Sequence, residues 1–324
     1  MKHFIINALA LAATIFSASC NKEFNGNVQP LAASGEQQIL FVVKNYSPST
    51  KSVSAAADST LSNVQIAVYN PDSLLVASGV TTSGTLTMSL PAGVAGYKVV
   101  ALANSPLNIA NITRFESVAG QTSTMNAANG LEMIDVLNQV TFNPAVPVDL
   151  TLKHMAAKVQ LDCVRDSIPY DAGFSIQSIY LVNVNTVCKF DFSVPSPDYK
   201  QVAGYQALET SITPLTYDAV NVALTTGNAH TTPHYFYCYP NPVDGGKQTR
   251  LVVQAEFGGN TYYYPVNITP DDVPVANNML YRINAINITG PGSTSPDVPV
   301  EKGNITFTLS VSSWGDGYSQ QVTI

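Results

Sequence analysis

Residues 281–314 read YRINAINITGPGSTSPDVPVEKGNITFTLSVSSW, and this stretch shows most clearly how the chain is built. Its second part alternates apolar and polar residues, which puts Phe307, Leu309 and Val311 on one face of a predicted strand. Such alternation is typical of a half-buried β-strand. The first part alternates less regularly and stops at the Gly-Pro-Gly turn of residues 290–292. The stretch therefore predicts two strands separated by a loop rich in turn residues.

Similar strand patterns precede this stretch along most of the chain. They lie at residues 64–70, 85–93, 96–105, 148–164, 174–184, 234–240, 250–257 and 260–268. Short strands at this spacing favour β-sandwiches or barrels over a sheet with alternating helices. We expect the strands at 234–240 and 250–257 to pair with each other. Residues 106–147 are less regular, and we expect a short helix at 130–138.

Length and composition point to two folded domains. A chain of 324 residues can form two cores, and charged residues make up only 11%, which is too few for a disordered protein. A fresh pair of strands begins at Val148, so we place the boundary at residues 144–147. The sequence thus predicts an all-β fold with two tandem sandwich domains, at residues 52–147 and 148–324.

The N-terminus, MKHFIINALALAATIFSASC, is typical of an export signal. Lys2 precedes an apolar run that is too short to span a membrane, and small residues follow it. We predict a signal peptide at residues 1–19. Cys20 comes directly after the small residues, as in a bacterial lipobox, and we predict that its thiol is acylated. The alternative is an ordinary signal with an incidental cysteine, because Ser17 stands where a lipobox usually has Leu.

Few patterns in the sequence point to chemistry. The net charge is −7 and Lys and Arg form no dense cluster, so we expect no nucleic-acid partner. No nucleophile elbow, phosphate-binding loop or His-Glu-x-x-His motif is present, so we expect no enzyme activity and no cofactor. The tyrosine-rich runs at residues 235–239 and 262–264 could stack on sugars, but strand aromatics that pack a core are the simpler interpretation.

The histidines and cysteines likewise indicate no particular chemistry. His230 and His234 are four residues apart, but Pro233 breaks any helix that could aim them at one metal, so we interpret them as loop residues and predict no metal site. Besides Cys20, three cysteines remain: Cys163, Cys188 and Cys238. The sequence is compatible both with a Cys163–Cys188 disulfide and with free buried thiols. None of the cysteines has zinc-ligand spacing.

One stretch near the N-terminus has an unusual design. Residues 39–52 read ILFVVKNYSPSTKS, in which five apolar residues favour a buried strand. A loop that contains Lys44 and Lys51 follows, and then a run of small polar residues up to the next strand at Val64. Exposed loops of small residues are where proteases cut. The sequence predicts a buried first strand that can be cut away from the rest of the chain.

Five stretches in order along the chain resemble the fimbrillins, the FimA-like major subunits of type V pili in Gram-negative anaerobes. They are VQIAVYN (64–70), VVALANS (99–105), LTLKHMAAKVQL (150–161), YYYPVNI (262–268) and residues 281–314. The last is the most specific, with its Ile-Thr-Gly-Pro-Gly turn and a late strand that ends at Trp314. The resemblance implies two β-sandwich domains of transthyretin-like topology with Greek-key-type connections.

The resemblance also implies a maturation path. The lipoprotein precursor reaches the outer membrane, and a trypsin-like protease cuts after Lys51, so that Ser52 becomes the new N-terminus. Residues 20–51 leave with the removable strand, whose inward residues are Ile39, Phe41 and Val43. A donor strand from another subunit then fills the groove. Its residues are Phe307, Leu309, Val311, Val322 and Ile324. The family often has Arg at the cut, so Lys51 leaves the identity of the protease open.

The expected partners follow from this path. They are other copies of the chain, the maturation protease, and anchor and tip pilins, while the sequence names no host or bacterial receptor. The function implied is a pilus-shaft subunit that serves adhesion at the cell surface. The alternatives are an anchor or tip subunit of the same pilus, or a surface lipoprotein that binds glycans and keeps Cys20.

Overall fold

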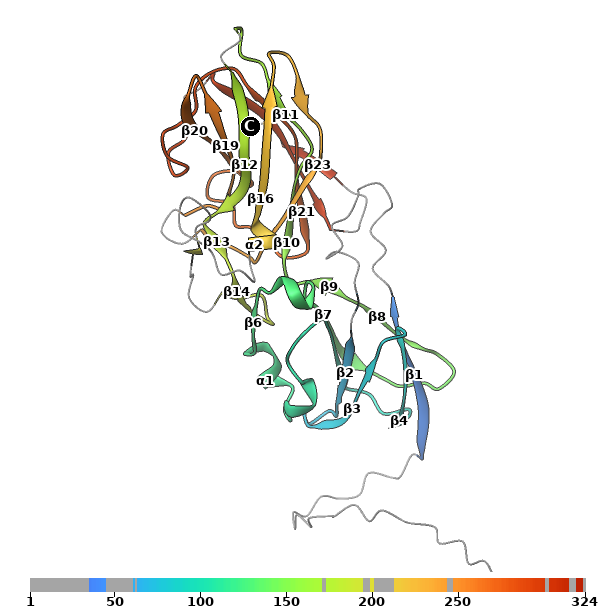
Figure 1. Ribbon diagram of the computed structural model, residues 1–324. Helices are drawn as coiled ribbons and strands as arrows, with labels where there is room; N and C mark the ends of the chain where they lie inside the picture. Colours follow the sequence, from blue (N-terminus) through green and yellow to red (C-terminus); the bar gives the residue numbers. More distant parts are fainter. Residues whose placement is uncertain are drawn as a thin grey trace, which may run out of the picture. The chain divides into compact units, whose positions relative to one another are not determined.

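The computed structural model shows an all-β protein, which confirms the predicted fold class (Figure 1). The described residues are 35–44, 61, 63–170, 173–194, 199–200, 213–243, 247–300, 303–314 and 319–322. Contacts group Gly35–Ile324 into a single unit. Within the described ranges the two α-helices have four residues each, α1 (Glu116–Ala119) and α2 (Thr213–Thr216), and no helix is long and apolar enough to cross a membrane.

Two sheets enclose the first hydrophobic core. One has three strands in the order β4 (Thr85–Pro91), β1 (Glu36–Lys44) and β8 (Val148–Thr151). The other has five strands, in the order β3 (Leu75–Thr81), β2 (Val64–Tyr69), β5 (Tyr97–Ala103), β7 (Met133–Val140) and β9 (Lys153–His154). Ile39, Phe41 and Leu90 from the first sheet share one buried cluster with Ile66 and Val99 from the second. This layering is that of a β-sandwich.

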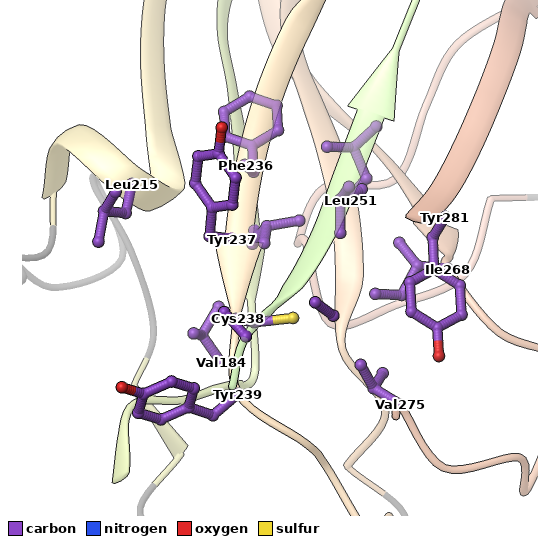
Figure 2. Packing of buried hydrophobic residues seen from close by; sticks show 14 of the residues in the cluster. Val184, Leu215, Phe236, Tyr237, Cys238, Tyr239, Leu251, Ile268, Val275 and Tyr281 are labelled. Carbon is purple, nitrogen blue, oxygen red and sulfur yellow. The ribbon is translucent and has the colours of Figure 1, made fainter. Parts of the chain in front are cut away.

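Two further sheets, of four and seven strands, follow in the second part of the chain. The four-stranded sheet has the order β16 (Tyr217–Leu224), β12 (Phe174–Val182), β19 (Arg250–Phe257) and β20 (Asn260–Asn267). The seven-stranded sheet contains β17 (Ala229–His230), β11 (Val164–Asp166), β21 (Met279–Ile288), β10 (Ala157–Leu161), β18 (His234–Cys238), β22 (Ile305–Ser313) and β23 (Ser319–Val322). Their inner faces share the largest buried cluster, part of which is shown around β18 in Figure 2.

Two predictions of local structure are wrong. The helix expected at 130–138 is strand β7, which pairs with β5 from Met133 to Val140. The strands at 234–240 and 250–257 do not pair with each other: β18 pairs with β10, whereas β19 pairs with β12 and β20. Phe236 and Leu251 instead belong to the same buried cluster, on strands of different sheets (Figure 2).

The strands of the first two sheets run past the boundary that we predicted at residues 144–147. Strand β8 pairs with β1, and β9 pairs with β7 through His154. The two-domain division stays a prediction, because hydrophobic contacts also continue across it. Tyr69, Leu102 and Ile134, on the outer face of the five-stranded sheet, belong to the same buried cluster as the second pair of sheets.

Two short ladders complete the described strands. Strand β6 (Thr122–Thr124) pairs with β14 (Val187–Lys189), and β13 (Val184–Asn185) pairs with β15 (Tyr199–Lys200). Two 3₁₀ turns, η2 (Ile109–Asn111) and η3 (Ala127–Asn129), lie between the strands of the first half. The three described cysteines are free, so the Cys163–Cys188 disulfide does not form. Burial raises the pKa of the Cys188 and Cys238 thiols to about 12, which keeps both unreactive.

A buried acid lies where the first and second halves meet. Glu132 is only 7% exposed, and its carboxyl accepts hydrogen bonds from the Ser123 and Ser105 hydroxyls. Ser123 also bonds to the Tyr239 hydroxyl, across the two halves of the chain. Burial is the largest influence and raises the pKa of Glu132 to about 7. The fold therefore favours the protonated acid, and ionisation of Glu132 works against folding.

We expect Glu132→Gln to remove one pH dependence of stability. A group whose folded pKa is raised from 4.5 to about 7 favours folding most below pH 4.5, and that advantage disappears as the pH rises to 7. The loss is on the order of 3 kcal/mol. The amide stays neutral, so urea unfolding at pH 8 should show the variant to be more stable than wild type by up to that amount. Parallel stability curves from pH 5 to 8 would contradict this, and Glu256→Gln, at an exposed site, is the control.

Candidate strand-exchange site

Strand β1 is the central strand of its sheet. It pairs antiparallel with β4, from Glu36 opposite Pro91 to Val42 opposite Thr85. On its other side it pairs parallel with β8, from Phe41 opposite Val148 to Lys44 opposite Thr151. No other described strand joins β4 to β8. Loss of β1 would therefore leave both neighbours with unpaired backbone groups that face the same gap.

The side chains of β1 alternate between core and surface. Ile39 and Phe41 are 0% exposed and Val43 is 5% exposed, whereas Leu40 between them is 38% exposed. Phe41 packs edge-on against Phe142, with ring centroids 6.0 Å apart. The structure thus places the three predicted inward residues together in the first core. Burial of each contributes about 1.5–3 kcal/mol relative to exposure.

We expect Phe41→Ala to lower the free energy of unfolding of the uncut chain far more than Leu40→Ala does. Truncation of a buried Phe usually costs about 3–5 kcal/mol, through lost burial and the cavity left behind. Leu40 faces solvent on the same strand, so its truncation should cost under about 1 kcal/mol. Urea unfolding of the two uncut variants measures this difference. Equal losses would show that β1 is not held by its inward face.

Of the two lysines in this region, Lys44 lies within the described residues and Lys51 does not. Lys44 is the last residue of β1, is paired into the ladder opposite Thr151, and forms an ion pair with Asp149 at 2.6 Å. Both side chains are more than half exposed, so the ion pair adds little stability. The ladder, however, protects the backbone at Lys44, because a protease needs a segment whose backbone is free of other strands. Lys51, Ser52 and Cys20 lie outside the described residues.

The two predicted donor segments occupy different positions in the seven-stranded sheet. Strand β22 carries Phe307, Leu309 and Val311 and pairs with β21 from Ile305 to Ser313. Leu309 is 0% exposed, and Phe307 and Val311 pack against the same core. Among the described strands β23 pairs only with β22, where Val322 is opposite Leu309, so β23 is an edge strand. Ile324 lies outside the described residues.

Trp314 holds the end of β22 in place. From the sequence we could predict only that a strand ends at this residue. Its indole is 4% exposed and stacks on His154, with centroids 3.8 Å apart. Its backbone N–H donates to the Asn278 carbonyl at 2.8 Å. Burial lowers the pKa of His154 to about 3, so the stacked imidazole is neutral. The chain is thus anchored through Trp314, and the described strand beyond it, β23, lies at an edge of the sheet.

The tyrosine-rich runs contribute mainly to cores. Tyr237 is 1% exposed and Tyr264 is 0% exposed, and both belong to the largest buried cluster. The Tyr264 hydroxyl donates to the Gly290 carbonyl at 3.0 Å, which ties β20 to the turn after β21. The simpler of the two sequence interpretations, strand aromatics that pack a core, describes these two residues.

Comparison with known proteins finds solved structures with a similar fold. No protein-family model and no curated protein matches the sequence. Among solved structures, a candidate cell adhesion protein from Bacteroides eggerthii is 20% identical with a TM-score of 0.68, over 87% of this chain and 97% of that one. The fimbrilin FimA from Porphyromonas gingivalis is 16% identical with a TM-score of 0.62, over 86% and 97%.

A third neighbour comes from the same organism. The tip fimbrial protein Mfa3 from Porphyromonas gingivalis, solved with a C-terminal truncation, is 14% identical with a TM-score of 0.51, over 86% of this chain and 100% of that one. At such low identity the likeness shows the fold alone. The resemblance to fimbrillins that we inferred from the sequence is confirmed at that level.

Proposed function

We propose that this chain, which has the fold of fimbrial proteins, is the structural subunit of a surface fimbria and polymerises by strand exchange. The observation that carries the proposal is the place of β1: a buried central strand that lies ahead of the predicted cut at Lys51. Fimbrial and candidate adhesion proteins among the structural neighbours support the same role.

The uncut chain is held as a monomer by its own first strand. While β1 is covalently attached, it fills the gap between β4 and β8 at a high effective concentration, so a strand from another molecule cannot compete. A cut after Lys51 makes β1 a separate peptide that can leave. The gap then exposes apolar side chains and two unpaired strand edges, which together form a template for strand addition.

The incoming strand must match the pattern that β1 leaves behind. It needs apolar residues at alternate positions to replace Ile39, Phe41 and Val43. Val322 and Ile324 alternate in this way at the C-terminus, in a segment that begins with an edge strand. Donation from one end of the chain to a groove at the other is head-to-tail, so it continues into a filament instead of closing into a dimer.

Export as a lipoprotein sets the order of these events. Acylated Cys20 would hold the precursor on the outer membrane, since stable anchoring needs more than one acyl chain and a lipoprotein cysteine carries two or three. Cleavage after Lys51 by a trypsin-like protease would release the folded chain from that lipid and open the groove in one step. Anchor and tip pilins would begin and end the filament, and adhesion would be the role of the assembled fimbria.

The composition of sheared surface filaments tests this role. We expect mass spectrometry to find this chain as the main filament component, with little of it in the membrane fraction. If the chain stays in the membrane fraction with its lipid while the filaments consist of another protein, it is an anchor subunit or a glycan-binding lipoprotein. A few copies per filament would indicate a tip subunit.

A further inference from the structure

Two histidines and an aspartate meet where the chain passes from one sheet to the other. Asp218 lies on β16, an edge strand of the four-stranded sheet. His230 ends β17 and His234 begins β18, and these two short strands pair with β11 and β10 of the seven-stranded sheet. Residues 231–233 separate them, so the two imidazoles come together without a helix and Pro233 is no obstacle.

The three side chains form a continuous series of short contacts. His230 Nε2 is 2.9 Å from His234 Nε2, and His234 Nδ1 is 2.7 Å from Asp218 Oδ2. The His234 ring lies nearly parallel to that of Phe236, at 10°, and its side chain is 8% exposed. The Asp218 side chain is 52% exposed, so the cluster opens to solvent on that side.

The hydrogen bonds decide which nitrogen of His234 is available. An ionised carboxylate can only accept, so the Nδ1–H of His234 donates to Asp218. A neutral His234 then keeps its lone pair on Nε2, which faces His230. A metal-bound histidine has this arrangement: its second nitrogen donates to a carboxylate, which fixes the ring and makes the ligand nitrogen more basic.

We propose that His230 and His234 bind one divalent transition-metal ion through their Nε2 atoms, with Asp218 as the outer partner of His234. Two nitrogens that are each about 2.0–2.1 Å from one ion lie about 2.9 Å apart at a right angle and about 3.3 Å apart at the tetrahedral angle. The 2.9 Å between the two Nε2 atoms is the length that the right angle requires. The ring centroids are 5.1 Å apart, so the two nitrogens now point almost straight at each other, as in a hydrogen bond. To bind one ion, both rings have to turn so that their Nε2 lone pairs converge, and the His230 proton has to move from Nε2 to Nδ1, so no net proton is released.

Ligand chemistry narrows the choice of ion. Imidazole suits zinc, copper and nickel, whereas magnesium and calcium prefer oxygen ligands. Among the described residues no group of three His, Cys, Asp or Glu surrounds one metal position, so water would complete the coordination shell. The site would therefore be weaker and more exchangeable than a structural zinc site with four protein ligands. A bound ion would brace β16 against β17 and β18 through the Asp218–His234 hydrogen bond.

Zinc titration of the metal-stripped full chain, purified without a histidine tag, tests the site. Zinc is the probe because free thiols do not reduce it. We expect one ion per chain by calorimetry, with NMR showing both Nε2 atoms as ligands. His230→Gln and His234→Gln should each weaken binding more than 100-fold. Asp218→Asn should keep both ligands but weaken binding about 10- to 100-fold.

A charge-matched control separates a site from general attraction of cations to an acidic chain. Asp271→Asn removes the same charge far from the cluster along the sequence and should leave the affinity unchanged. The proposal is overturned if no ion binds, if His230→Gln binds zinc as wild type does, or if Asp271→Asn and Asp218→Asn weaken binding equally. His230 is more exposed than His234, so the decision rests on His230→Gln if His234→Gln does not fold.

Discussion

A chain that lacks residues 315–324 should fold, be exported and be cut after Lys51, and yet should not polymerise. The folded body should tolerate the deletion because β22 stays paired with β21 along its length. Leu309 stays buried in the core, and Trp314 stays stacked on His154. Of the described strands only β23 is lost, and it pairs along one side with β22.

Polymerisation should fail for the opposite reason. The segment beyond Trp314 contains Val322 and Ile324, which can replace the inward residues of β1 in a neighbour. Electron microscopy should show no filaments from the truncated chain, and size-exclusion chromatography should show cleaved monomer. A synthetic peptide of residues 315–324 should bind the cleaved chain but not the uncut one. Filaments of normal length would show that the donor strand lies elsewhere.

Lys51→Ala should stop assembly one step earlier. Without a basic residue in the loop, a trypsin-like protease cannot free β1, so lipidated precursor should accumulate on the membrane as monomer. The effect should be close to complete, because β1 competes for its own groove at high effective concentration. Immunoblotting of membrane and surface fractions should show the longer precursor, and filaments should be absent.

Lys44→Ala is the matched control for this prediction. Lys44 is also a lysine close to the removable strand, but it is held in the ladder with β8 and paired with Asp149. Loss of this exposed ion pair should cost less than about 1 kcal/mol, so the variant should mature and polymerise as wild type does. A block in Lys44→Ala with normal filaments from Lys51→Ala would move the cut to Lys44.

The parts of the fold set by local sequence pattern could be predicted, and the parts set by distant partners could not. The alternation at residues 305–311 predicted β22, and five apolar residues predicted the buried strand β1. Residues 131–138 place Leu131, Ile134 and Leu137 at helical spacing, yet they form β7, because pairing with β5 outweighs this local pattern.

The candidate sites, too, could be predicted from the sequence only in part. Period-two alternation puts Ile39, Phe41 and Val43 on one face of a strand, whereas the core that this face meets and the neighbours β4 and β8 could be known only from the fold. A spacing of four residues indicates a shared metal on a helix, and Pro233 excludes a helix there, so the sequence favours loop residues at His230 and His234. In the structure they lie on two strands and meet across the break between them, a geometry with no signature in the sequence. Trp314 likewise gains its role from residues far away along the chain, among them His154 and Asn278.

The N-terminal residue of the subunits in sheared surface filaments tests the central claim most directly. If β1 is cut away to open the groove, Edman degradation or mass spectrometry should find Ser52 as the first residue, with no acyl group and no peptide from residues 39–43. If the filament subunits instead begin at acylated Cys20 and still contain residues 39–43, β1 has not been removed and the strand-exchange account is wrong.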